Sequence, residues 1–370
     1  MQVTREYSGR LPLRQLELRA ANLLFCGALR AKRHLLLLLA SLAAGCGGGS
    51  PTGPQPTPTP GFPVSGYVFY DENGNGIADA AEVVRLPGVT VSIGGRSGVT
   101  GAGGRFTVED APGGQQSASA LPTSLPAYFT GVMQSVSVPT GGDLAIPAEL
   151  PLGNRARRNV YLAFGDSITW GEGSSDLSGY RGYLQADLRS YWGKATLESS
   201  GVPGTKSNVG QERLPGVLAE FRPGYLLILY GTNDWNEPQC RDAFPCFTID
   251  ALRSMIHQAR GAGAEAILGT IPPVNPDYTD RNAAGRNAWV KQMDGAIHVM
   301  AQQEQVAVAE IYDDFESQPS LSALFSDDKH PNDAGYRIMA RSFFNAITRP
   351  YPSSSASSAR SLFAFSPRRR

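Results

Sequence analysis

The sequence predicts an α/β fold with a parallel sheet for the second half of the chain and a smaller all-β domain before it. Between residues 159 and 349, short apolar runs alternate with helix-like segments, as is typical of a parallel sheet covered by helices on both faces. Between residues 64 and 147, apolar and polar residues alternate with a period of two, and glycine-rich turns separate the runs. This pattern indicates antiparallel strands with one buried face. We therefore expect two folded domains, at residues 64–150 and 158–349.

The composition supports folded domains and argues against nucleic-acid binding. Of the 370 residues, 41% are hydrophobic and 18% are charged, which provides a sizeable core and too little charge for a disordered chain. The formal net charge is +0, but seven basic and only two acidic residues precede Cys46. The remainder is therefore mildly acidic and offers no electrostatic attraction for nucleic acid.

Residues 1–46 have the features of an export signal. A basic stretch at residues 30–34 precedes a leucine-rich run and small residues that end at Cys46, the order found in secretory signal peptides. The apolar run is about half of the roughly 20 residues that span a bilayer, so no permanent transmembrane helix is expected. Residues 42–46 resemble the lipobox of bacterial lipoproteins, whose cysteine is acylated. We expect an exported protein that a lipid on Cys46 anchors to a membrane, in the periplasm or at the cell surface; secretion through an ordinary signal peptide is the alternative.

Two further segments lack the patterns of a folded domain. Residues 47–63 are rich in proline and glycine and predict an extended, semi-rigid linker. Residues 350–370 are rich in serine and end in three arginines, so we expect a disordered basic tail.

The β domain, for which the periodicity predicts a small antiparallel β-sandwich, contains one loop with the spacing of a metal site. Residues 71–82 place oxygen-bearing side chains at loop positions 1, 3, 5, 9 and 12, with glycine at position 6. This is the ligand spacing of an EF-hand calcium loop, although residues 67–70 before it read as a strand. The stretch from residue 66 to residue 89 resembles the B-type repeats of bacterial serine–aspartate-repeat surface proteins.

This resemblance implies a structural calcium ion in the β domain. The implied ligands are the side chains of Asp71, Asn73, Asn75, Asp79 and Glu82 and the backbone carbonyl of Ile77. The alternative is an asparagine–glycine turn that joins two strands without a metal.

In the second domain, apolar runs predict strands and helical periodicity predicts helices. The predicted strands are 160–164, 195–198, 225–230, 264–269 and 306–311. The predicted helices are 180–191, 217–221, 248–262, 285–303 and 333–347.

A serine stands where the first of these strands ends. Ser167 lies in a Gly-Asp-Ser-Ile-Thr turn directly after the apolar run, and ligands of open α/β sheets bind just outside the carboxyl ends of the strands. A reactive serine needs a base to take its proton and a third group to orient that base. His330 can act as the base, since imidazole titrates near neutral pH, and Asp327 can orient it from the same loop. The alternative role for Ser167 is a helix N-cap.

Two more segments offer hydrogen-bond donors at the same edge of the sheet. Asn233 follows the strand that ends at Tyr230, and Gly201 and Gly204 follow the preceding strand. Glycine lets a backbone N–H approach a ligand closely, and a tetrahedral intermediate needs such donors for its oxyanion. Three strand ends and one C-terminal loop are thus expected to converge.

These segments match, in order, the four sequence blocks of the SGNH, or GDSL-type, hydrolases. The matching residues are 165–169, Gly204, 231–234 and 327–331. The resemblance implies a flavodoxin-like α/β/α sandwich that hydrolyses esters without a metal or other cofactor. One departure is Ser199, which stands where the family usually has asparagine and leaves the support of the Gly204 loop open.

The resemblance also implies a role for each of the matching residues. Ser167 is the implied nucleophile, His330 the base, and Asp327 the group that orients it. The backbone N–H groups of Ser167 and Gly204 and the side chain of Asn233 are the implied oxyanion hole.

Other polar residues in this domain favour structural roles. Asp166 and Asp234 are expected to brace loops, and Asp328 is a less well spaced rival for orienting the histidine. His257 and His298 lie in helical segments and are expected to be structural or solvated.

Two cysteines follow the Asn233 block closely. In an exported protein, Cys240 and Cys246 are expected to form a local disulfide, and a pair of free thiols is the alternative. Two cysteines without nearby histidines make a poor zinc site.

The function expected from the sequence is an exported serine ester hydrolase that acts on acyl or acetyl esters of carbohydrate or lipid. Two alternatives remain open: an acyltransferase that uses the same site, and a non-catalytic surface-binding protein. Binding alone does not need a nucleophile and a base, so the four blocks favour catalysis.

Overall fold

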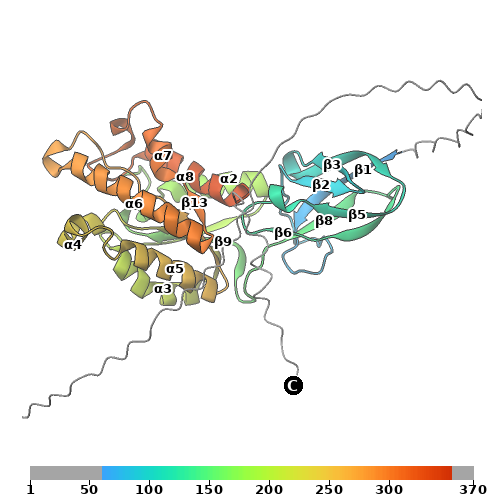
Figure 1. Cartoon of the computed structure of the whole chain (residues 1–370), viewed down its shortest axis with the longest axis horizontal. Helices are drawn as coiled ribbons and strands as arrows, with labels where there is room; N and C mark the ends of the chain where they lie inside the picture. Colours follow the sequence, from blue (N-terminus) through green and yellow to red (C-terminus); the bar gives the residue numbers. More distant parts are fainter. Residues whose placement is uncertain (1–60, 352–370) are drawn as a thin grey trace, which may run out of the picture. The chain divides into compact units, whose positions relative to one another are not determined.

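The structure is a computed structural model that describes residues 61–351 (Figure 1). The predicted signal peptide with Cys46, most of the predicted linker at residues 47–63 and the tail from residue 352 lie outside the described residues. Within the described range, no helix combines the length and the apolar character needed to cross a membrane.

Residues 61–149 form two four-stranded sheets. One sheet has the strand order β4-β1-β8-β6 and the other the order β3-β2-β5-β7. Side chains from both sheets, such as Val68 and Val91, are fully buried in a common core, which explains the period-two pattern of the sequence. The strands are β1 (Gly61–Tyr70), β2 (Thr90–Ile93), β3 (Arg96–Val99), β4 (Arg105–Pro112), β5 (Gly114–Ala120), β6 (Thr130–Gly131), β7 (Gln134–Val138) and β8 (Leu144–Glu149).

One pairing in these sheets differs from the predicted antiparallel arrangement. β1 pairs with β4 in antiparallel register, but it pairs with β8 in parallel register, with Tyr67 opposite Ala145. Parallel partners need a long crossover connection, and β2 to β7 all lie between these two strands in the chain. Periodicity is local, so it cannot identify so distant a partner. In addition, β1 begins at Gly61, inside the segment predicted as linker.

The second domain contains the predicted parallel sheet, with five strands in the order β10-β9-β11-β12-β13. Counted from the start of this domain, the order is 2-1-3-4-5, which is that of flavodoxin-like sheets. The order reverses between β9 and β11, and ligands of such sheets bind at this point. The strands are β9 (Arg157–Gly165), β10 (Thr196–Gly201), β11 (Pro223–Leu229), β12 (Glu265–Gly269) and β13 (Ala307–Ala309).

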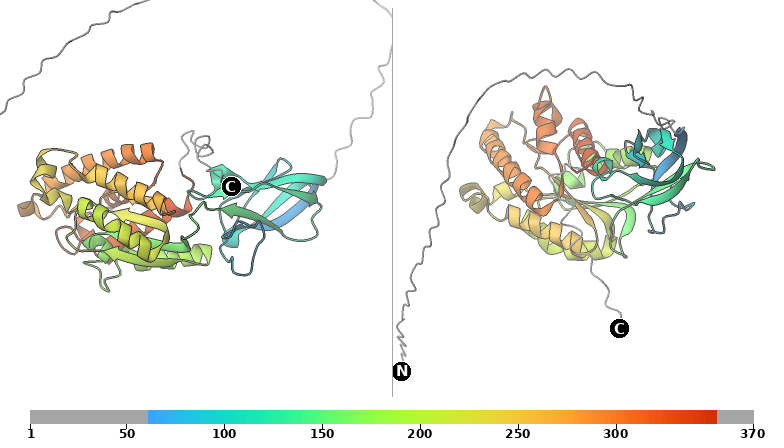
Figure 2. Two further views of the ribbon diagram at one scale, coloured as in Figure 1. Left: turned by 90° about the horizontal axis from the view of Figure 1, so that it is seen from below. Right: turned by 45° about the vertical axis from the view of Figure 1, so that its right-hand side comes forward.

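Helices cover both faces of the parallel sheet (Figure 1), and Figure 2 shows the same layers from two further directions. Leu162 and Phe164 of β9 belong to a core with α3, α5 and α6, whereas Tyr161 and Ala163 belong to a core with α2 and α8. Burial on both faces explains why the strands are almost continuously apolar. The helices are α1 (Ser167–Trp170), α2 (Tyr180–Trp192), α3 (Ser207–Phe221), α4 (Pro238–Asp242), α5 (Thr248–Gly261), α6 (Ala283–Glu304), α7 (Ile311–Glu316) and α8 (Asp333–Thr348).

Helix α3 is longer than the sequence predicts, because it continues through a proline. It begins at Ser207, well before the predicted range 217–221, and contains Pro215. Proline has no N–H to bond the carbonyl four residues earlier. The side chain of Gln258 on α5 donates to that carbonyl, on Gln211, at 3.3 Å. The neighbouring helix therefore satisfies the group that the proline leaves without a helical partner.

The last predicted strand is shorter than expected. β13 spans only Ala307–Ala309, and α7 begins at Ile311, within the range 306–311 predicted as a strand. The apolar run thus includes the first residue of a helix, which periodicity in a short window does not distinguish from a strand.

Candidate active site

The nucleophile candidate is held at the start of a short helix. β9 ends at Gly165, and the Asp166 side chain caps α1 by accepting from the N–H of Ile168 at 2.9 Å. Ser167 is the first residue of α1 and is 4% exposed. The N–H groups in the first turn of a helix have no partner within the helix. The N–H of Ser167 is therefore available to a ligand.

The loop before α8 brings a histidine and an aspartate to this serine. The hydroxyl oxygen of Ser167 lies 2.9 Å from Nε2 of His330, and Nδ1 of His330 lies 2.6 Å from Oδ2 of Asp327. The other oxygen of Asp327 accepts the backbone N–H groups of His330 at 2.7 Å and Lys329 at 2.9 Å. With Nδ1–H donating to the carboxylate, Nε2 is left as the acceptor for the serine hydroxyl.

The charge of Asp327 is favoured by these bonds. Its partial burial alone would raise its pKa, but the side-chain and backbone hydrogen bonds from His330 and the one from Lys329 outweigh that effect and lower the pKa. Asp328 does not contact the imidazole; its carboxylate lies 3.3 Å from the ammonium of Lys329 and 3.9 Å from the guanidinium of Arg286. The structure thus places Asp327, and not its rival, beside the histidine.

The predicted oxyanion donors come from the loops after β10 and β11. Gly204 has φ = +74° and open space around it. The side-chain nitrogen Nδ2 of Asn233 lies 3.1 Å from Oδ2 of Asp166 and 3.1 Å from the carbonyl of Thr205. Asn233 therefore joins the turn that carries Ser167 to the loop that carries Gly204.

Two buried aspartates hold these loops together, as the sequence predicts. Asp234 accepts from the backbone N–H of Ser207 at 2.9 Å and from the hydroxyls of Ser207 at 2.6 Å and Thr248 at 2.7 Å. Burial raises its pKa. Burial also raises the pKa of Asp166 to about 7, against the opposing effect of the Ile168 N–H.

Arg213 is a supporting residue that the sequence does not reveal. Its guanidinium donates to the hydroxyl of Ser200 at 2.7 Å, to the carbonyl of Gly165 at 3.0 Å and to the hydroxyl of Tyr230 at 2.7 Å. It also lies over the ring of Phe164, 4.1 Å from the ring centre. It thereby ties together the carboxyl ends of β9, β10 and β11, and Ser200 takes part in this support beside the family departure at Ser199.

Two further residues that the sequence does not reveal hold the histidine loop. Asn275 donates its backbone N–H to the carbonyl of Asp328 at 3.0 Å and its side-chain NH₂ to the carbonyl of Asp327 at 3.2 Å. Arg286 is 7% exposed, lies 3.9 Å from the carboxylate of Asp328 in the histidine loop and donates to the carbonyl of Thr232 at 2.8 Å, so it joins that loop to the Asn233 loop. Neither residue belongs to a motif, so only the folded chain shows its role.

A second carboxylate approaches the histidine from the opposite side. Oε2 of Glu172 lies 3.4 Å from Nε2 of His330, and the Glu172 side chain is 49% exposed. No sequence motif includes this residue, although it lies only five positions after Ser167.

The two cysteines near the Asn233 loop are joined. Cys240 and Cys246 form a disulfide with their Cα atoms 4.8 Å apart. The indole N–H of Trp289 on α6 donates to the carbonyl of Cys240 at 2.8 Å. The disulfide therefore closes the segment that follows the Asn233 loop, and the indole hydrogen bond joins this segment to α6.

The loop at residues 71–82 turns its two buried carboxylates onto its own backbone. Asp71 accepts the N–H groups of Gly74 and Gly76, each at 2.7 Å. Glu82 accepts the N–H of Glu72 at 2.7 Å. These bonds fold the loop into a compact turn.

The side chains of the remaining implied ligands are only partly oriented for binding a metal. Asn73 and Asn75 present their side-chain nitrogens to Oδ2 of Asp79, at 2.6 and 3.0 Å, and Ile77 donates its N–H to Oδ1 of Asn75 at 2.7 Å. Within residues 61–351, no group of three or more histidine, cysteine, aspartate or glutamate side chains is arranged to hold a metal. A half-turn of each amide would present oxygen in place of nitrogen, so calcium binding by this loop stays a prediction.

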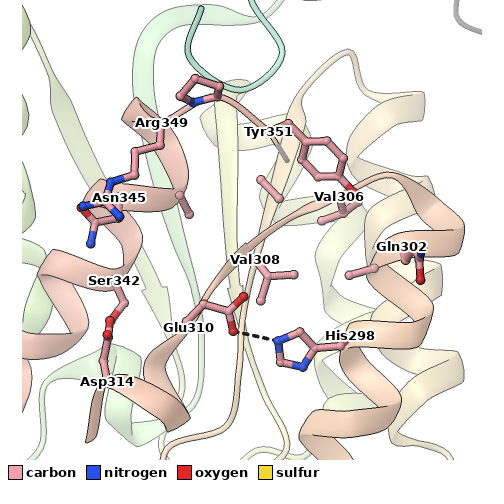
Figure 3. A pocket seen from close by; sticks show the side chains of 14 residues that line it. His298, Gln302, Val306, Val308, Glu310, Asp314, Ser342, Asn345, Arg349 and Tyr351 are labelled. Carbon is pink, nitrogen blue, oxygen red and sulfur yellow. Dashed lines mark hydrogen bonds and ion pairs between the residues drawn. The ribbon is translucent and has the colours of Figure 1, made fainter. Parts of the chain in front are cut away.

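The two histidines that the sequence predicts to be structural or solvated lie away from Ser167. His257 pairs with Glu304 at 2.8 Å on the surface. His298 pairs with Glu310 at 2.7 Å and lines a hollow of about 620 Å³ beside β13 (Figure 3). Figure 3 shows Arg349 and Asn345 on one side of this hollow and Val306 and Gln302 on the other. It contains none of the predicted catalytic residues.

A model of the GDSL-like Lipase/Acylhydrolase family matches residues 163–338. This range contains Ser167, Gly204, Asn233, Asp327 and His330. The match identifies it as a GDSL-type hydrolase domain, and the chain is a carboxylic ester hydrolase.

Individual relatives and solved structures are more distant. The chain is 27% identical over 161 residues to Esterase TesA of Pseudomonas aeruginosa, which covers 44% of this chain and 74% of the relative. It is 28% identical over 116 residues to the Thioesterase 1/protease 1/lysophospholipase L1 of Escherichia coli, and spans 52% of that relative. A lipase/acylhydrolase structure from Enterococcus faecalis is similar with a TM-score of 0.44 and 20% identity, over 51% of this chain and 95% of that one.

Proposed function

We propose that the protein hydrolyses carboxylic esters through Ser167, His330 and Asp327. The observation that carries the proposal is the continuous hydrogen-bonded chain from the serine hydroxyl through the imidazole to the aspartate, with distances of 2.9 and 2.6 Å. A nucleophile, a base and an orienting group within hydrogen-bond reach are the arrangement that activates a serine.

The proposed reaction has two stages. Nε2 of His330 takes the hydroxyl proton while the oxygen of Ser167 attacks the ester carbon, and the resulting imidazolium gives that proton to the departing alcohol. The acyl group remains on the serine until His330 activates a water molecule that releases it as a carboxylic acid. In both stages the charge of Asp327 stabilises the imidazolium.

The oxyanion of the tetrahedral intermediate is proposed to face three donors. The N–H of Ser167 has no helical partner, and Gly204 has the positive φ and open surroundings that allow its backbone to approach a ligand. The Asn233 side chain would exchange its bond to the carbonyl of Thr205 for one to the oxyanion. Each such donor contributes roughly 10²–10³-fold to the rate.

The test is hydrolysis of p-nitrophenyl esters of increasing acyl length by the full chain and by its Ser167→Ala variant. We expect the variant to lose at least about 10³-fold in kcat. The chain-length profile distinguishes an acetyl esterase from a lipase. Equal, negligible rates for the two folded proteins would refute the proposal.

The remaining predictions from the sequence are tested separately. We propose that Cys46 carries a lipid anchor, so Cys46→Ser should move the protein from the membrane fraction to the soluble one. We also propose that residues 71–82 bind calcium, so excess calcium should raise the melting temperature relative to a chelator. A Cys46→Ser protein that stays with membranes would contradict the lipid anchor. Equal melting temperatures with calcium and with chelator would contradict calcium binding.

A further inference from the structure

Glu172 has the geometry of a residue that acts on the substrate. Its Oε2 lies 3.4 Å from Nε2 of His330, the same nitrogen that accepts the Ser167 hydroxyl at 2.9 Å. About half of the glutamate side chain is exposed to solvent, whereas His330 is buried. The carboxylate therefore occupies the solvent side of the atom that transfers protons in the proposed reaction.

The main chain at this position is fixed, so the approach is built into the fold. The N–H of Glu172 donates to the carbonyl of Ser167 at 3.0 Å, and the hydroxyl of Tyr336 donates to the carbonyl of Glu172 at 2.6 Å. Gly173 follows with φ = +94°, and a Cβ there would lie 3.1 Å from the Cβ of His330. The chain at 172–173 is thus packed directly against the histidine.

The negative charge of Glu172 is not neutralised by a neighbouring cation. Among residues 61–351, no lysine or arginine pairs with it, and Nε2 of His330, which accepts the Ser167 proton, carries no positive charge that would offset it. The nearby Arg181 donates to the backbone carbonyls of Trp170 and Leu177 and pairs with no carboxylate in this region. Asp333, which accepts the N–H of Ser175 at 2.9 Å, adds a further negative charge on this side.

The proton that His330 gives to the departing alcohol brings this leaving group close to the negative charge of Glu172. Nε2 of His330 must give its proton to the oxygen of the departing alcohol, so that alcohol has to lie within hydrogen-bond distance of Nε2. It therefore also lies close to the Glu172 carboxylate. A carboxylate accepts hydrogen bonds from hydroxyl groups and repels phosphate or carboxylate groups.

We propose that Glu172 is a specificity-determining residue that selects esters with an uncharged, hydroxyl-bearing leaving group, such as a sugar hydroxyl, and discriminates against leaving groups that carry an anion. This inference rests on the proposed ester hydrolysis and extends it to the substrate class. Phosphate-bearing thioesters and lysophospholipids are the disfavoured class.

The experiment compares two acetate esters, p-nitrophenyl acetate and its ring-carboxylated analogue, with rates corrected for their reactivity toward hydroxide. The measured quantity is the ratio of kcat/KM for the neutral ester to that for the anionic ester. We expect Glu172→Gln to lower this ratio about tenfold. Glu220→Gln, which removes the same charge from the exposed surface of α3, should leave it unchanged.

A second measurement does not depend on any variant. Salt screens exposed charges, so raising the ionic strength should lower the ratio for the unmodified protein. A ratio that is insensitive both to salt and to Glu172→Gln would overturn the inference while leaving the esterase proposal intact. An equal drop in Glu220→Gln would assign the effect to overall charge and also overturn it. If neither ester were hydrolysed faster than by Ser167→Ala, the proposed function itself would fail.

Discussion

Two of the histidine–carboxylate pairs in the hydrolase domain are almost alike at the carboxylate. Nδ1 of His330 lies 2.6 Å from Asp327, and Nε2 of His298 lies 2.7 Å from Glu310 (Figure 3). The pairs differ at the second ring nitrogen. In His330 this nitrogen faces the hydroxyl of Ser167, whereas in His298 it lies 2.7 Å from the backbone carbonyl of Asp294.

The partner of this second ring nitrogen determines whether the histidine can act as a base. A carbonyl only accepts hydrogen bonds, so both nitrogens of His298 must donate and the ring is held as an imidazolium. The hydrogen bond to Glu310 raises the pKa of His298 to about 9, with the Asp294 carbonyl adding to the rise and partial burial opposing it. A protonated ring cannot take a proton from anything. A carboxylate partner therefore does not make a histidine a base; a hydroxyl on the other nitrogen does.

The largest expected effect separates the two histidines. His330→Gln should lower kcat for p-nitrophenyl esters by about 10⁵-fold, because the serine loses its base. His298→Gln should keep the unmodified rate, since its ring does not reach the serine. Steady-state kinetics on both variants checks this, and a comparable loss in the two would abolish the distinction.

Substitution of the two carboxylates, Asp327 and Glu310, should show the same contrast in kcat, with a smaller loss than for the histidines. Asp327→Asn should lower kcat by about 10⁴-fold, because an amide no longer holds Nδ1–H and the ring can adopt the other tautomer. Glu310→Gln should leave kcat unaltered. The same assay measures both, and a slow Glu310→Gln enzyme would show that the hollow beside β13 is coupled to catalysis.

Asp294, the buried residue beside the His298–Glu310 pair, should make the stability of the fold depend on pH. Burial raises the pKa of Asp294 from 3.8 to about 8, so the folded chain keeps a proton that the unfolded chain releases. Its contribution to the free energy of unfolding therefore falls as the pH rises from about 4 to 8. Asp294→Asn should reduce the drop in melting temperature between pH 5 and pH 8 by a few degrees, whereas Asp187→Asn on the exposed face of α2 should not.

The smallest expected effect concerns the His298–Glu310 ion pair itself. Because the folded pKa of His298 lies above its unfolded value of 6.5, the pair stabilises the fold fully below about pH 6.5 and loses this effect as the pH rises through about 9. The side chains are nearly half exposed, so the effect is about 1 kcal/mol or less. Glu310→Gln should lower the melting temperature slightly at pH 6 and not at pH 10. A constant difference across this range would mean that packing, not charge, is lost.

Local sequence signals predicted much of this domain. The Gly-Asp-Ser-Ile-Thr turn after an apolar run placed Ser167 at a strand end, and the spacing of Asp327 and His330 placed both in one loop. Each of these predictions depends on residues that are neighbours in the chain. The parallel sheet was predictable for the same reason, because strands and helices alternate along the sequence.

The features that the sequence did not reveal depend on distant contacts. The parallel pairing of β1 with β8 joins strands from opposite ends of their domain. Arg213 supports the site only because three strand ends meet around its guanidinium. Glu172 lies next to a recognised motif, but its significance depends on a histidine more than a hundred residues later. No periodicity or spacing rule reports such a meeting.

The turn that presents Glu172 also has a consequence for protein engineering. Gly173 has a positive φ, and a Cβ there would lie 2.3 Å from the hydroxyl of Ser326 and 2.5 Å from the carbonyl of Pro331, so almost any side chain would displace the loop that carries His330. Position 172 has the opposite character, with a pinned backbone and a side chain that reaches solvent. A library randomised at both positions would be inactive nearly throughout, whereas one randomised at residue 172 alone would sample new leaving-group preferences on an intact catalytic centre.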